Sequence, residues 1–195
     1  MTPPLASPAT PPRSLLRKAL HALIIVAVLH QFVVADFMSE PWEQAESASE
    51  ELFFTLHALV GMTIGALVLL FMLNLSRASG MPAQLWPWFS AAGRGALWQA
   101  GRRLVSRQAD LVDEERAAKA WQGLGLLIML TLAMTGTTIY LLPDQPDLMQ
   151  DIAEVHEGAV SLLWLYLVGH VGMTIWHALQ GRHLWRDMFS WRRRR

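Results

Sequence analysis

The chain has 195 residues, of which 53% are hydrophobic, and its sixteen Lys and Arg balance its sixteen Asp and Glu, so that the formal net charge is zero. This balance, with the basic residues flanking apolar runs, argues against nucleic-acid binding, and the absence of cysteine excludes disulfides and thiolate metal ligands. Charged and apolar residues are segregated along the chain rather than mixed, which indicates a membrane protein.

Four apolar runs each approach the ~20 residues that a helix needs to cross a bilayer. They lie at about 15–37, 52–75, 121–142 and 155–179. The first run imitates a signal peptide, but it is long and lacks a clear A-x-A cleavage site, so we expect it to be retained. The sequence therefore predicts an all-α membrane protein, a four-transmembrane-helix bundle over residues 15–195, preceded by a disordered, proline-rich tail over residues 1–14.

The basic residues predict which ends of the helices face the cytoplasm. All sixteen Lys and Arg lie before or at the start of the first span, between the second and third spans, or after the fourth. The two other connections, 36–51 and 143–154, contain no Lys or Arg and ten Asp or Glu between them. By the positive-inside rule, both termini and the long connection over residues 76–120 are expected to be cytoplasmic.

The first span carries His21 near its cytoplasmic end and His30 nine residues later. Nine residues turn a helix by ~180°, so the two side chains are expected to point in opposite directions and cannot ligate one metal. For His30 we favour a structural role, with the imidazole bonded to a neighbouring helix or placed at the surface of a homodimer.

The second span places His57 near its outer end, followed by Gly61 and Gly65 at i+4 and i+8. The two glycines lie on nearly the same face of the helix. Their missing side chains would let either a flat cofactor or another helix approach closely, and the sequence does not decide between these interpretations.

The connection between the second and third spans contains an aromatic and basic segment, 84–105, which is typical of an amphipathic helix that lies in the headgroup region. The third span has no ionisable residue. We expect its threonines to bond to their own backbone or across the bundle, a structural role that we favour over contact with a quinone or haem. They are Thr131, Thr135, Thr137 and Thr138.

The fourth span contains His156, His170 and His177. Steps of fourteen and seven residues turn the helix by only about −40° and −20°, so the three imidazoles form one stripe, with ~21 Å and then ~10 Å between them. Ionisable residues inside a membrane are costly and usually face a partner within the bundle. The stripe therefore predicts partners on other helices.

Depth below the outer membrane surface pairs the histidines of different helices. His57 and His156 both lie within ~7 Å of the outer ends of their helices, whereas His21 and His170 both lie ~24 Å from them. Two facing imidazoles suit the axial positions of an iron porphyrin, and zinc would usually require four protein ligands. A histidine-lined proton or metal-ion transporter is the alternative.

Several stretches resemble the prokaryotic cytochrome b561 and hydrogenase b-type cytochrome family. The most specific is the fourth-span pattern H-E-x12-H-x6-H, formed by His156, Glu157, His170 and His177. The others are RKALHAL, FTLHALVG, LWPWF and the TG of the third span. The resemblance covers most of residues 15–195 and implies a multi-pass protein of the bacterial inner membrane.

The resemblance also implies a function and a set of site residues. It implies two haem b groups, one ligated by His57 and His156 near the outside and one by His21 and His170 near the cytoplasm. Such proteins pass electrons between the quinone pool and a redox partner protein or subunit, either as an electron-transfer subunit or as a quinone-linked oxidoreductase. We expect Gly61 to be a secondary contact. His177 is expected not to ligate iron but to contact a haem propionate or a quinone oxygen, or to lie at the membrane interface.

Overall fold

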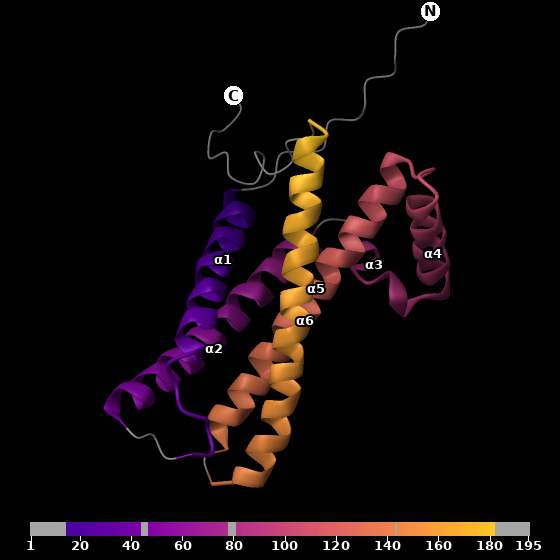
Figure 1. Cartoon of the computed structure of the whole chain (residues 1–195). Coiled ribbons are helices and arrows are strands. Elements are labelled where there is room, and N and C mark those ends of the chain that lie inside the picture. The colour runs from indigo at the N-terminus through magenta and orange to yellow at the C-terminus, as the bar shows by residue number, and fades with distance from the viewer. Residues whose placement is uncertain (1–14, 44–46, 78–80, 143, 182–195) are drawn as a thin grey trace, which may run out of the picture.

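The computed structural model describes residues 15–43, 47–77, 81–142 and 144–181, and nearly all of them lie in helices (Figure 1). The tail predicted over residues 1–14 lies outside the described residues. In chain order the elements are α1 (Leu15–Ala35), α2 (Ala48–Ser76), α3 (Met81–Leu85), the 3-10 helix η1 (Pro87–Phe89), α4 (Ala91–Val105), α5 (Leu111–Leu141) and α6 (Pro146–Leu179).

Four of these helices, α1, α2, α5 and α6, are long and apolar enough to cross a membrane. In the bundle α1 packs on α2, α2 on α5, and α5 on α6. α1 meets α6 mainly through long side chains, as where Phe32 stacks on Trp164 with their ring centroids 4.3 Å apart. The predicted fold class is confirmed: the chain is an all-α membrane protein built as a four-helix bundle.

Two of the long helices, α2 and α5, begin before their apolar runs because polar residues cap them earlier. α2 begins at Ala48, where the Ser47 hydroxyl accepts a hydrogen bond from the Glu50 backbone N–H. α5 begins at Leu111, where the Asp110 carboxylate caps the Asp113 N–H in the same way. An oxygen at the N-cap satisfies a backbone donor that the first helical turn leaves free. Hydropathy therefore locates the membrane-crossing part of α2 and α5, and their N-caps locate where these two helices start.

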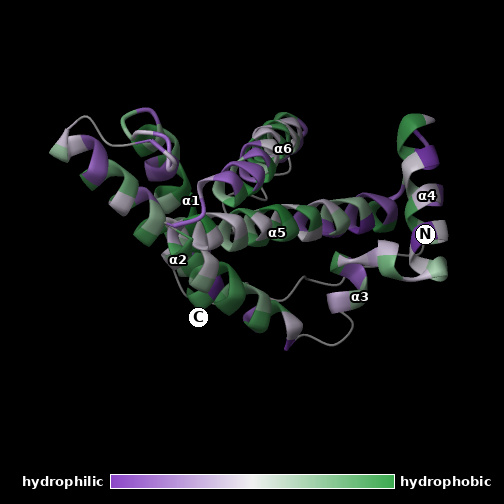
Figure 2. Ribbon diagram, turned by 90° about the horizontal axis from the view of Figure 1, so that it is seen from below, coloured by the Kyte–Doolittle hydropathy of each residue, from purple (hydrophilic) through white to green (hydrophobic). Residues whose placement is uncertain are grey.

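The bundle buries a modest core and exposes a large apolar surface. Hydrophobic residues run along much of the four long helices (Figure 2). Val68 and Phe71 of α2 and Leu126 of α5 are buried at its centre. By contrast, apolar side chains on the outer faces of α1 and α6, such as Val26 and Val168, are about two-thirds exposed. Exposed apolar faces on long helices are expected where lipid rather than water surrounds the protein.

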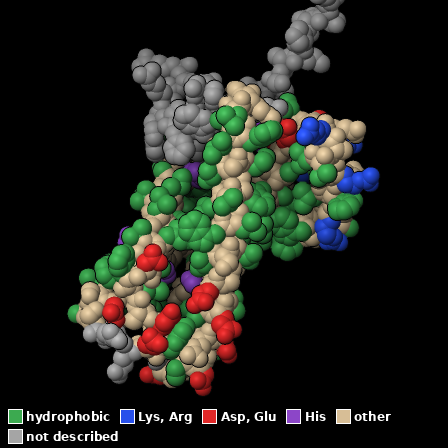
Figure 3. Space-filling view, in the orientation of Figure 1, with side chains coloured by type: hydrophobic (Ala, Val, Ile, Leu, Met, Phe, Trp, Pro, Cys, Tyr) green, Lys and Arg blue, Asp and Glu red, His purple; other side chains and the backbone are tan. Residues whose placement is uncertain are grey.

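Charge separates the two ends of the bundle (Figure 3). Acidic side chains gather where α1 joins α2 and α5 joins α6, and we call this the acidic end. Basic side chains lie at the opposite end, over α4, which we call the basic end. This distribution keeps charge away from the apolar middle of the four long helices.

The segment 84–105, expected to lie in the headgroup region, forms the end of α3, η1 and α4, and α4 packs beside the first part of α5 (Figure 1). A Cβ added at Gly123 would overlap the Leu85 carbonyl, so glycine allows α3 to approach the backbone of α5. Phe89 and Trp98 remain more than 70% exposed. They leave an aromatic surface that suits contact with headgroups.

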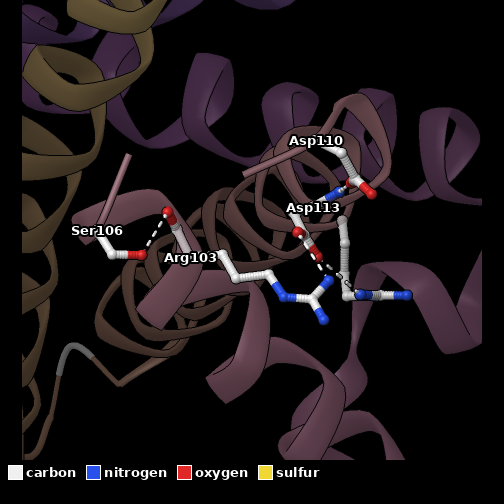
Figure 4. A network of polar contacts seen from close by, with 5 residues as sticks. Arg103, Ser106, Asp110 and Asp113 are labelled. Atoms are coloured by element: carbon white, nitrogen blue, oxygen red, sulfur yellow. Dashed lines mark hydrogen bonds and ion pairs between the residues drawn. The ribbon is translucent and has the colours of Figure 1, made fainter. Parts of the chain in front are cut away.

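An ion-pair network connects α4 to the start of α5 (Figure 4). The buried Asp113 carboxylate lies 3.3 Å from Arg103 Nη1 and 3.4 Å from Arg116 Nη1. The side chains of both arginines remain partly exposed, so only the Asp113 carboxylate of this network is fully shielded from water. A buried carboxylate is tolerated when charged donors satisfy it.

The turn between α4 and α5 places a non-glycine residue in the left-handed region. The Gln108 N–H donates to the Arg103 carbonyl at 2.8 Å and the Arg107 N–H donates to the Leu104 carbonyl at 3.2 Å, which is the pattern of a Schellman motif. Arg107 has a φ of 57°, a conformation that glycine adopts without steric cost.

We expect Arg107→Gly to stabilise this turn by up to about 1 kcal/mol, because it relieves the left-handed strain of an L-residue. Thermal unfolding of the purified protein in detergent would measure the change as a higher Tm. Gln108→Gly, at a position whose φ is not positive, is the matched control and should not raise the Tm. A lower Tm for Arg107→Gly than for the wild type would contradict the argument.

Three carboxylates lie near one another at the acidic end. Partial burial raises the pKa of Glu40, and the charges of Glu157 and Glu43 raise it further. Because the folded protein holds this proton more tightly than the unfolded chain does, the ionised Glu40 weakens the fold above its raised pKa. That penalty is relieved as the pH falls through the raised pKa.

We therefore expect Glu40→Gln to raise the Tm at neutral pH and to leave it unchanged at a pH below the pKa of Glu40. Thermal unfolding at a series of pH values would measure the difference between variant and wild type. Glu154→Gln, which alters an exposed acidic residue of α6, is the control and should show no such convergence. An equal difference at every pH would show that charge repulsion at Glu40 is not the cause.

Candidate functional site

Two pairs of histidines face each other inside the bundle, and each pair joins different helices. His57 of α2 lies opposite His156 of α6, with the ring centroids 6.3 Å apart and the ring planes at 66°. We call these two residues the acidic-end pair. His21 of α1 lies opposite His170 of α6, with centroids 6.4 Å apart and planes at 54°, and these form the basic-end pair. The structure thus brings together the same histidines that were paired by their depth along the helices.

The separation of the rings matches that of two imidazoles bound to one metal ion. A metal–imidazole bond of about 2.0–2.1 Å, with roughly 1.2 Å from the nitrogen to the ring centre, places two such centroids roughly 6.4 Å apart across the metal. Among the described residues, no group of three or more His, Cys, Asp or Glu side chains could hold a metal ion. Each pair therefore fits a metal whose remaining ligands come from a bound group, as in a porphyrin.

The acidic-end pair borders a cavity of about 180 Å³. Small side chains keep the cavity open on three helices: Ala58 and Gly61 of α2, Ala133 and Gly136 of α5, and Ala153 of α6. Glu40 and Glu157 also line it. Cofactor sites of helix bundles are built in such spaces between facing helices.

Gly61 lies in the cavity wall and also against α1. A Cβ added there would come within 2.9 Å of Gln31 Nε2. That same amide donates a 2.8 Å hydrogen bond to the backbone carbonyl of His57. Gly61 therefore admits the side chain of Gln31, and Gln31 in turn ties α1 to the turn of α2 that carries His57. A side chain of α1 thus lies close to Gly61.

The two imidazoles of the acidic-end pair are held differently. His57 Nδ1 is buried and has no hydrogen-bond partner in the part of the chain that the structure describes. His156 Nδ1 lies 2.8 Å from the Thr135 hydroxyl of α5. A Cβ added at Gly136 would come 3.2 Å from His156 Cε1, so glycine lets this imidazole lie close to the α5 backbone.

Aromatic rings support the basic-end pair. Tyr166, one helical turn before His170, stacks on its imidazole with centroids 5.5 Å apart and an interplanar angle of 18°. Trp121 of α5 stacks on Tyr166 at 5.7 Å and 19°. Glycines on the facing helices make room for these rings, since a Cβ at Gly125 would overlap Tyr166 and one at Gly169 would come within 2.5 Å of Trp121.

Sequence reasoning missed Thr135 and Tyr166 as neighbours of the histidines, and Trp121 as the ring that stacks on Tyr166. It favoured a structural role for the α5 threonines, and each does bond to a carbonyl of its own helix. Thr135 additionally reaches His156, which the threonine spacing alone does not reveal. The spacing of four residues between Tyr166 and His170 was a signal that the two rings could meet, because residues i and i+4 share a helix face.

His30 and His177 lie outside both pairs. Neither stacks on another ring within residues 15–43, 47–77, 81–142 and 144–181. His30 lies on α1, and its Nδ1 is buried with no hydrogen-bond partner among those residues. His177 is half-buried in the last turn of α6, beyond His170.

The chain matches a family model. The model of the prokaryotic cytochrome b561 family matches residues 12–191, which is nearly the whole chain and includes all four long helices. No curated protein and no solved structure matches the chain. The chain therefore belongs to the prokaryotic cytochrome b561 family, and is a haem b-binding electron-transfer protein of the membrane.

Proposed function

We propose that the protein holds two haem b groups and passes electrons between the quinone pool and a redox partner protein. The observation that carries this proposal is the presence of two histidine pairs whose ring centroids lie 6.3 and 6.4 Å apart. Each pair joins two helices across the bundle, and each separation suits one iron ion between two imidazoles. When bound, each haem supplies an iron that accepts and returns one electron.

His57 and His156 are the proposed ligands at the acidic end, and His21 and His170 those at the basic end. The apolar walls of the cavity beside His57 and His156 would exclude water from the porphyrin faces. Because Tyr166 stacks on His170 and Thr135 contacts His156, each α6 imidazole is oriented by a side chain outside its pair. The protein therefore contributes orientation and a water-poor environment.

The two proposed sites lie at different depths. The fourteen residues from His156 to His170 span ~21 Å of α6, which is most of a bilayer's hydrocarbon thickness. Electrons delivered at one end could thus leave at the other. The same stepped arrangement favours electron transfer over ion transport, because four of the six histidines in the described residues form two separate pairs at different depths.

The orientation that we propose places the basic end in the cytoplasm and the acidic end outside, in a bacterial inner membrane. The basic residues of α4 and its neighbours support it through the positive-inside rule. The haem held by His57 and His156 would then lie near the outer face. The acidic residues around that face would favour cationic partners over anionic ones.

Haem stoichiometry tests the ligand assignment. His57→Ala and His156→Ala should each remove the acidic-end haem, and His21→Ala and His170→Ala the basic-end haem, because a single remaining imidazole holds haem less well. Haem per folded protein would be measured from the reduced haemochrome spectrum and the protein concentration. His30→Ala and His177→Ala are the controls and should retain two haems. A ligand variant that keeps two haems with unchanged axial ligation would remove that residue from the assignment.

Reporter fusions test the orientation. Alkaline phosphatase, which is active only outside the cytoplasm, should be active when fused after Glu46 and inactive when fused at Arg195. A fluorescent reporter that folds only in the cytoplasm should give the reverse result. The opposite pattern from both reporters would invert the topology and exchange the positions of the two haems.

A further inference from the structure

The hydroxyl of Thr135 lies between the helix backbone and a proposed haem ligand. Thr135 Oγ1 is 2.8 Å from the Thr131 carbonyl and 3.2 Å from the Leu132 carbonyl. On its other side it is 2.8 Å from His156 Nδ1. The hydroxyls of Thr131, Thr137 and Thr138 instead donate to carbonyls of α5 itself.

The positions of the protons follow from what each group can donate. A threonine hydroxyl has one hydrogen, and a carbonyl oxygen can only accept. The hydrogen of Thr135 is therefore donated to the backbone carbonyl of Thr131 or Leu132, and a lone pair is left for His156. The neutral imidazole then carries its hydrogen on Nδ1 and donates it to Thr135, which leaves the lone pair of Nε2 available to a metal.

We propose that Thr135 is a positioning residue for His156, which fixes the tautomer and rotation of this imidazole and thereby tunes the haem at the acidic end. The inference rests on the proposed ligation of that haem by His57 and His156. Gly136 assists, because its missing side chain lets the imidazole lie against α5, 3.2 Å from where a Cβ would be.

The two ligands of the acidic-end pair would then differ as electron donors. An imidazole that donates its second N–H to an acceptor is a more basic ligand for the metal on its other nitrogen. His156 has the Thr135 hydroxyl as such an acceptor, with the Leu132 backbone carbonyl beside it, whereas His57 Nδ1 has none among the described residues. A more basic ligand favours ferric over ferrous iron. The hydroxyl of Thr135 therefore lowers the midpoint potential of this haem.

Thr135→Val tests the inference, because valine keeps the shape of threonine and removes the hydroxyl. The purified protein with its haems would be titrated potentiometrically, and its ferric haems examined by electron paramagnetic resonance. We expect the component that is absent from His156→Ala to shift to higher potential, by about 59 mV if ferric affinity falls tenfold more than ferrous affinity. Its resonance should change as the imidazole rotates, and the other haem should be unaffected.

Two variants control for helix stability. Thr135→Ser restores a hydroxyl and should restore the wild-type potential. Thr131→Val removes another hydroxyl of α5, one that donates to the Leu127 carbonyl 3.0 Å away, and should leave both potentials unchanged. If Thr135→Val does not assemble, Thr135→Ala provides the same comparison with a smaller side chain.

The outcomes separate this inference from the proposed function. A wild-type potential and resonance in Thr135→Val, together with haem loss in His156→Ala, would overturn the role of Thr135 and leave the haem assignment standing. Equal shifts in Thr135→Val and Thr131→Val would also overturn it, since helix stability would then be the cause. Retention of both haems in His156→Ala would instead overturn the proposed ligation on which the inference rests.

Discussion

An imidazole within the hydrocarbon region needs a polar or metal partner, and in this bundle that requirement fixes how the helices face one another. α6 presents His156 and His170 on nearly the same side because fourteen residues are close to a whole number of turns. The partners come from different helices, His57 from α2 and His21 from α1. A change in the rotation of α6 would therefore separate both pairs at once.

α5 has no histidine, yet it positions both imidazoles of α6. Near the acidic end Thr135 bonds to His156, and near the basic end Trp121 stacks on Tyr166, which stacks on His170. Glycine makes these approaches feasible, as Gly125 does for Tyr166. Metal sites commonly depend on such supporting groups as much as on the ligands themselves. The contact between α5 and α6 thus packs two helices together and also positions the proposed ligands of α6.

The sequence was enough to predict the four-helix fold, because each span is an apolar run of the required length. Helix geometry also paired His57 with His156 and His21 with His170, since depth depends only on residue number along a regular helix. It could not predict that Thr135 reaches His156, because that contact depends on the rotation of α5 relative to α6. The packing of α4 on α5 escaped prediction for the same reason: Asp113, Arg103 and Arg116 meet only once the chain has turned at Arg107.

The connectivity divides every histidine pair between two halves of the chain. α1 and α2 form one helical hairpin and carry His21 and His57, whereas α5 and α6 form the other and carry His156 and His170. Each hairpin thus supplies one member of each pair, and neither hairpin contains a complete site. Any group bound between the rings would link the two hairpins, so its binding free energy would also be free energy of assembly. If the proposed haems bind there, the supply of cofactor during biosynthesis would add to the α2–α5 packing in drawing the inserted chain into the closed bundle.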